Sequence, residues 1–107
     1  MEIRTYGVIG SGQMGNGIAQ VAAMSGCYVI MNDINDEFVD RGYATITRNL
    51  DKSVEKGKMS KEDRDAILGR ITKSIDIRDM ANCDFVVEAV TENDPSERRD
   101  RSQAVGT

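Results

Sequence analysis

The amino-acid sequence predicts an α/β fold built on a parallel sheet of about four strands. Four short β-prone runs alternate with segments that carry the spacing of amphipathic helices. The runs are continuously apolar, which is typical of parallel strands covered on both faces. With 107 residues, 39% of them hydrophobic and 30% charged, the chain is expected to form one globular domain.

The first three elements are predicted to form a strand–helix–strand unit. Residues 3–9 are the first strand, and residues 28–31 are the second. Between them lies a helix that Gly26 ends in the usual C-terminal glycine position. The apolar residues at helical spacing, and hence its expected packing face, are Met14, Ile18, Val21 and Ala22.

A polar helical hairpin is predicted after the second strand. Asn35 or Asp36 caps its first helix, and residues 56–58 end it. A shorter second helix begins after Ser60 and ends near Gly69. The expected apolar positions of the first helix are Phe38, Tyr43, Ile46, Leu50 and Val54.

The remaining elements complete the predicted domain. Residues 71–75 form a third strand, residues 77–80 one helical turn, and residues 85–90 the fourth and most hydrophobic strand. These elements place the domain at residues 1–93. Residues 94–107 are charged and lack apolar periodicity, so they are predicted to be a disordered tail.

The motif that carries chemistry is Gly10-x-Gly12-x-x-Gly15, which lies between the first strand and the first helix. In a dinucleotide-binding Rossmann fold these glycines permit a tight turn, approach to a pyrophosphate and close helix packing. The helix N-terminus offers free N–H groups to phosphate. Asp33 ends the second strand, 23 positions after Gly10. Its carboxylate would accept hydrogen bonds from ribose hydroxyls and repel a 2′-phosphate, so NAD is favoured over NADP.

Two alternatives to this interpretation remain open. The same fingerprint also occurs in FAD-binding proteins, and the glycines could serve only as turn residues while Asp33 acts only as a cap. The three glycines, the strand before them, the helix after them and Asp33 together favour NAD. The loop residues expected to bind it are Gly10, Ser11, Gly12, Gln13, Met14 and Gly15.

Composition excludes several other classes of function. The formal net charge is −4 and no basic patch is visible, so we expect no nucleic-acid partner. No apolar run approaches the roughly 20 residues that span a bilayer, and no signal peptide is recognised, so no membrane partner is expected. The sequence lacks histidine and has two cysteines, Cys27 and Cys83. We therefore expect no metal site, free thiols and a cytoplasmic location.

A longer run of residues carries a resemblance to a known family. Residues 7–20, which read GVIGSGQMGNGIAQ, are similar to the N-terminal signature of the 3-hydroxyacyl-CoA dehydrogenases, most closely the bacterial 3-hydroxybutyryl-CoA dehydrogenases. The similarity continues through Asp33, residues 54–58 and 67–71, to residues 87–93. It covers about residues 2–93.

This resemblance implies a reversible hydride transfer between C3 of a 3-hydroxyacyl-CoA and NAD, in fatty acid or butanoate metabolism. By position, Asp33 matches the ribose-binding aspartate, and Ala89 and Glu92 match residues that line the nicotinamide half of the cofactor site. Lys56 matches a lysine that faces CoA, although its place in a lysine-rich turn slightly favours a solvated surface lysine. The parent enzymes follow the Rossmann domain with a helical domain.

The chain also departs from the family. Glu97 stands where the family has a lysine, and the family's catalytic His–Glu pair has no counterpart in a sequence without histidine. We therefore name no catalytic residue and expect a truncated Rossmann fold, an NAD-binding fragment that is inactive by itself. The alternative is a non-catalytic nucleotide-binding or interaction module. An open edge at the last strand would favour self-association.

Overall fold

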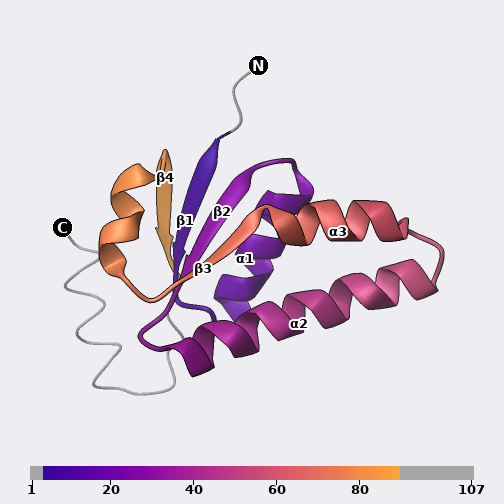
Figure 1. Cartoon of the computed structure of the whole chain (residues 1–107), viewed down its shortest axis with the longest axis horizontal. Coiled ribbons are helices and arrows are strands. Elements are labelled where there is room, and N and C mark those ends of the chain that lie inside the picture. The colour runs from indigo at the N-terminus through magenta and orange to yellow at the C-terminus, as the bar shows by residue number, and fades with distance from the viewer. Residues whose placement is uncertain (1–3, 90–107) are drawn as a thin grey trace.

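The computed structural model describes residues 4–89 and contains four parallel strands in the order β3-β2-β1-β4. The elements in chain order are β1 (Thr5–Ile9), α1 (Gln13–Met24), β2 (Tyr28–Asn32), α2 (Asp36–Glu55), α3 (Lys61–Gly69), β3 (Ile71–Ser74), the 3-10 helix η1 (Ile77–Asn82) and β4 (Phe85–Glu88). In Figure 1 the α2–α3 hairpin extends from one side of the sheet, with η1 and β4 on the other side. The predicted α/β fold and its helical hairpin after the second strand are confirmed.

The strand order of the sheet reverses beside β1. This reversal indicates where a ligand would bind. The chain moves from β1 to β2 and β3 in one direction, then crosses back so that β4 pairs with the other edge of β1. Gly7 of β1 lies between Ile30 of β2 and Val86 of β4. In open parallel sheets, ligands bind outside the carboxyl ends of the strands at such a reversal. Here that place is the end of β1, where α1 begins.

The buried stripe of helix α2 differs from the predicted one mainly in the first half of the helix. Its buried residues are Val39, Gly42, Ile46 and Leu50, at spacings of three and four. Ile46 and Leu50 were predicted, whereas Phe38 is 36% exposed and Val39 takes its place in the core. A helix turns 100° per residue, so one position is enough to move a side chain from the core to the rim.

The predicted packing face of α1 was right for two of its four residues. Ile18 and Ala22 are partly buried and pack against the core. The fully buried residues of the helix are small: Gly15, Asn16, Ala19 and Ala23. Met14 and Val21 lie outside the core, 60% and 64% exposed. A helix that sits closely on a sheet accommodates only small side chains at its contact face, and the spacing of the larger apolar residues did not reveal this.

Strand β4 is less covered than its sequence indicated. Phe85 and Val86 are 43% and 47% exposed, although continuous apolar runs predict strands buried on both faces. Within residues 4–89, β4 pairs only with β1 and is an edge strand. The backbone N–H of Ala89 still donates to the carbonyl of Ile9, at 2.7 Å. The predicted Val90 and the predicted tail at 94–107 lie outside the described residues.

A close contact between β1 and η1 explains a glycine in the middle of the sheet. A Cβ added at Gly7 would lie 2.6 Å from Sδ of Met80 and 2.8 Å from Sγ of Cys83. Gly7 therefore lets η1 pack directly on the central strand. Burial raises the pKa of the Cys83 thiol, and the nearby carboxylates of Asp84 and Asp79 raise it further.

The N-cap of α2 gives a first testable effect on stability. Oδ1 of Asn35 accepts a hydrogen bond from the backbone N–H of Phe38 at 2.9 Å. Replacing Asn35 by alanine removes this acceptor and is expected to lower the free energy of unfolding by about 1 kcal/mol. Urea denaturation followed by circular dichroism measures the change. Asn35→Ser is the control and should stay close to wild type, because serine is an equally good cap.

Candidate functional site

The loop after β1 is built by two glycines that no other residue replaces without strain. Gly10 has a φ of +102°, and its N–H donates to the carbonyl of Asn32 at 2.7 Å, which ties the loop to the end of β2. A Cβ added at Gly15 would overlap the backbone carbonyl of Gly10. The start of α1 therefore sits directly against the turn, as expected for the first and third glycines of the motif.

The N-terminus of α1 is open to a ligand. Gly12 is its N-cap, makes no side-chain capping hydrogen bond, and is exposed together with Gln13 and Met14. The first N–H groups of a helix have no partner within the helix, and they carry a partial positive charge. The first turn of α1 contains no acidic side chain that would neutralise this partial positive charge. This end of α1 is therefore suited to an anion such as a pyrophosphate.

Asp33 lies beside this loop, as predicted, and most of its hydrogen-bonding capacity is already in use. Its Oδ2 accepts from the backbone N–H of Ser11 at 2.8 Å and from Oγ of Ser11 at 2.6 Å. Its Oδ1 accepts from the N–H of Ile34 at 2.8 Å. A carboxylate offers about four lone-pair positions, so about one remains for a ribose hydroxyl.

Ser11 connects the loop to three elements and is only 3% exposed. Besides Asp33, its Oγ faces the carbonyl oxygen of Phe38 at 2.9 Å. Nδ2 of Asn16 approaches its carbonyl oxygen at 3.4 Å. Gly42 of α2 packs against it so closely that an added Cβ would lie 2.5 Å from the same oxygen. Phe38, Gly42 and Asn16 were not predicted as site residues. The one available signal was a glycine inside a helix, which is unfavourable by about 1 kcal/mol and needs a packing reason.

The other predicted site residues are placed as follows. Ala89 is 2% exposed and lies at the same carboxyl edge of the sheet, next to Ile9. Lys56 is the C-cap of α2, and Gly42 of the same helix packs against Ser11, so about 20 Å of helix separates Lys56 from the loop. Glu92 lies outside the described residues. The structure thus brings together the glycine loop, Asp33 and Ala89, and it places Lys56 elsewhere.

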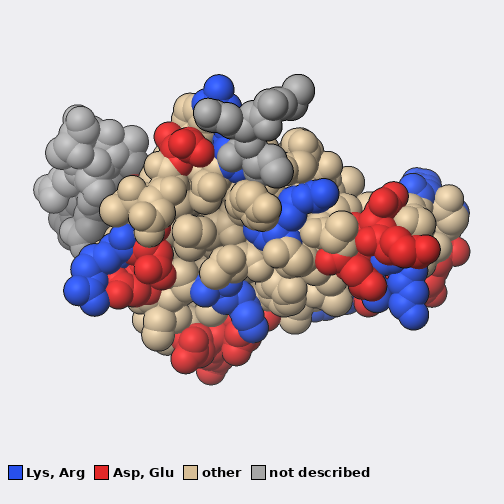
Figure 2. All heavy atoms as spheres, turned by 45° about the horizontal axis from the view of Figure 1, so that its top comes forward, with Lys and Arg blue, Asp and Glu red and all other residues tan. Residues whose placement is uncertain are grey.

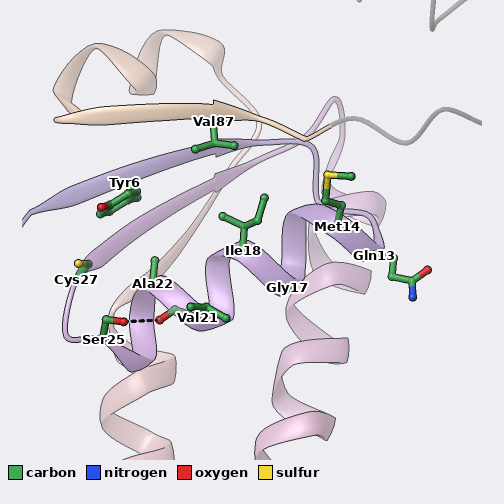
Figure 3. A pocket seen from close by; sticks show the side chains of 10 residues that line it. All are labelled: Tyr6, Gln13, Met14, Gly17, Ile18, Val21, Ala22, Ser25, Cys27 and Val87. Carbon is green, nitrogen blue, oxygen red and sulfur yellow. Dashed lines mark hydrogen bonds between the residues drawn. The ribbon is translucent and has the colours of Figure 1, made fainter.

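An apolar hollow of about 550 Å³ lies between α1 and the strands β1 and β4 and reaches from the start to the end of the helix. Figure 3 shows Ile18 and Ala22 of α1 below Tyr6 of β1 and Val87 of β4. The residues once expected in the core, such as Met14 and Val21, line this hollow instead. Asp33 does not line it, and apart from Gln13 and Met14 at the open start of α1 the lining is mostly apolar. The hollow therefore begins at the helix end that is suited to an anion.

The charged surface has mixed sign. On the face drawn in Figure 2, basic and acidic side chains are interspersed, and both gather at the end of the hairpin. Within the described residues, no group of three or more His, Cys, Asp or Glu side chains is arranged to hold a metal ion. None of the helices found between residues 4 and 89 is long and apolar enough to cross a membrane.

Comparison with known proteins identifies relatives of this arrangement. A family model described as "3-hydroxyacyl-CoA dehydrogenase, NAD binding domain" matches residues 5–98. A probable 3-hydroxybutyryl-CoA dehydrogenase of Deinococcus radiodurans is 52% identical over 88 residues, which are 82% of this chain and 31% of that protein. A 3-hydroxybutyryl-CoA dehydrogenase of Bradyrhizobium diazoefficiens is 41% identical over 97 residues, 91% of this chain and 33% of the relative.

The solved structures agree with these relatives. The crystal structure of (S)-3-hydroxybutyryl-CoA dehydrogenase from Ralstonia eutropha superposes with a TM-score of 0.85 and 41% identity. The match covers 98% of this chain and 37% of that structure. The chain thus spans about a third of the length of the relatives that it matches.

Proposed function

The chain belongs to the family of NAD-binding domains of 3-hydroxyacyl-CoA dehydrogenases, and from this premise we propose that it provides the cofactor site of a dehydrogenase acting on a 3-hydroxyacyl-CoA. NAD is the cofactor of this family, so the FAD alternative is set aside. When bound, NAD would accept the hydride that leaves C3 of the hydroxyacyl group. The residues of this chain bind and orient the dinucleotide.

The observation that carries the proposal is the joint placement of an open helix N-terminus and an acidic ribose acceptor on one loop. The uncapped start of α1 is suited to the pyrophosphate, and Gly15 brings it against the turn at Gly10. Asp33 is tied to the same loop through Ser11 at 2.8 Å, so the two anchors keep a constant separation. This arrangement offers one anchor to the pyrophosphate and one to the adenosine ribose.

Catalysis needs a proton acceptor at the substrate hydroxyl, and the 107-residue sequence contains no histidine. We assign this step to groups outside the sequence in hand. The remaining family positions stay proposals: Ala89 and Glu92 toward the nicotinamide, and Lys56 toward CoA, where an ammonium would pair with phosphate. The expected setting is fatty acid metabolism in the cytoplasm, which the two free thiols support.

A calorimetric titration of the purified chain with NADH tests the proposal, with NADPH as the matched control. We expect saturable NADH binding and at least tenfold weaker NADPH binding, because Asp33 would repel a 2′-phosphate. Absence of binding to both dinucleotides contradicts the proposal. Binding of NADH without turnover, even when the rest of a relative's chain is added, favours the alternative of a non-catalytic nucleotide-binding module.

We also propose self-association through the β4 edge. Phe85 and Val86 are about half exposed there, and the apolar hollow beside Val87 adjoins them. An edge strand with apolar side chains is a template for pairing with a second copy. Sedimentation velocity across a range of protein concentrations should show a dimer. A Val86→Lys variant should remain monomeric, whereas a concentration-independent monomer in wild type contradicts the proposal.

A further inference from the structure

We propose that Ser11 is a positioning residue that sets the preference for the unphosphorylated ribose, and that α2 holds Ser11 in place for this purpose. The inference rests on the proposed NAD-binding function. The motif assigns no role to the side chain at the position after its first glycine, since only the glycines and the acidic residue are specified. In this chain the side chain is a buried hydroxyl with two acceptors, Asp33 and Phe38.

The first step of the argument concerns Asp33. Among residues 4–89, Asp33 accepts three hydrogen bonds, and two of them come from Ser11, one from its backbone and one from its hydroxyl, both to Oδ2. Two donors on one oxygen fix the rotation of the carboxylate. The remaining lone-pair position then points in one direction. A ribose hydroxyl meets an acceptor that is already oriented, and a 2′-phosphate meets a full negative charge.

The second step concerns what holds Ser11. The hydroxyl carries one proton and lies between Oδ2 of Asp33 at 2.6 Å and the carbonyl of Phe38 at 2.9 Å. On its backbone side, Gly42 leaves no room for a Cβ, and Asn16 approaches from α1. Ser11 is therefore enclosed between α1, α2 and Asp33 with a single position for its side chain. Helix α2 acts as the outer wall of the cofactor loop.

The third step separates this role from simple packing. A serine that only filled space would affect both dinucleotides equally when removed. A serine that acts through Asp33 affects NADH, whose ribose uses the oriented carboxylate, more than NADPH, whose phosphate cannot use it. Its effect also shrinks when the carboxylate is replaced by an amide, because the Ser11 hydroxyl then donates to a neutral acceptor instead of a charged one.

The experiment measures NADH and NADPH affinity by calorimetry for wild type, Ser11→Ala, Asp33→Asn and the double variant. Ser11→Ala should weaken NADH binding about tenfold, the loss expected for a hydrogen bond to a charged group, and change NADPH binding by less than about twofold. In the Asp33→Asn background, where the acceptor is a neutral amide oxygen, the same substitution should have a clearly smaller effect. Ser53→Ala, at the far end of α2, is the matched control and should change neither affinity.

Gly42→Ala is the second variant and leaves every side chain of the loop intact. Its Cβ would displace Ser11, so it should reduce the NADH-to-NADPH preference in the same direction. The inference would be overturned if Ser11→Ala and Gly42→Ala lost affinity for both cofactors equally. It would also be overturned if Ser11→Ala kept its full effect in the Asp33→Asn background. In either case, NADH binding by the wild type would still support the proposed function. A wild type that binds neither cofactor overturns both.

Discussion

Replacing Gly15 by alanine is expected to abolish NADH binding and to lower the free energy of unfolding by about 3 kcal/mol. The added Cβ would overlap the carbonyl of Gly10, which is backbone and belongs to a turn that is itself held to Asn32. The backbone of this turn cannot rotate away from the new methyl group, so α1 must shift from the sheet. The expected loss of about 3 kcal/mol is the upper end of the usual cost of overpacking. The shift moves the N–H groups that would receive the pyrophosphate. Urea denaturation and an NADH titration measure the two losses.

Gly17→Ala is the matched control for this substitution. Gly17 lies on the same helix, two positions further on, and an added Cβ meets no atom within 4 Å. Alanine is the better helix former by about 1 kcal/mol, so this variant should be slightly more stable than wild type and should bind NADH normally. If the two variants behaved alike, the close approach of Gly15 to Gly10 would not be the reason for that glycine.

Replacing Asp33 by asparagine should weaken NADH binding by about 10- to 100-fold and remove most of the discrimination against NADPH. The loss corresponds to one hydrogen bond to a charged group, about 1.5–3 kcal/mol. The amide also carries N–H donors, one of which would face the donors of Ser11 or Ile34. The carboxylate charge that would repel a 2′-phosphate is gone as well. Parallel titrations with both dinucleotides measure the change in ratio.

Asp40→Asn makes the same change of charge without touching the loop. Asp40 is an exposed residue of α2 whose carboxylate pairs with Lys73 at 2.9 Å. An exposed ion pair of this kind contributes about 0–1 kcal/mol, so stability should barely change. Both cofactor affinities should stay within about twofold of wild type. If Asp40→Asn lost as much of the preference for NADH over NADPH, the preference would depend on the net charge of the protein and not on Asp33.

Sequence reasoning succeeded where the signal is local. The βαβ unit, the glycine turn and the N-cap at Asn35 depend on residues a few positions apart, and each was found at its predicted place. It failed at α1, where Met14 and Val21 were expected in the core and lie outside it. Spacing identifies an apolar face but does not say which partner covers it. The same limit applies to β4, because its apolar sequence does not say whether other elements cover the strand.

The sequence by itself determined the fold class, the family and the cofactor, because the glycines and Asp33 are read from fixed spacings along one short segment. Only the tertiary structure decided how the site is supported. Ser11, Phe38 and Gly42 are up to 31 positions apart and make contact because α2 folds back against the loop after β1. Contacts between elements depend on packing depth and helix rotation, which no spacing rule specifies. The residues that hold the cofactor loop are therefore visible only in the folded chain.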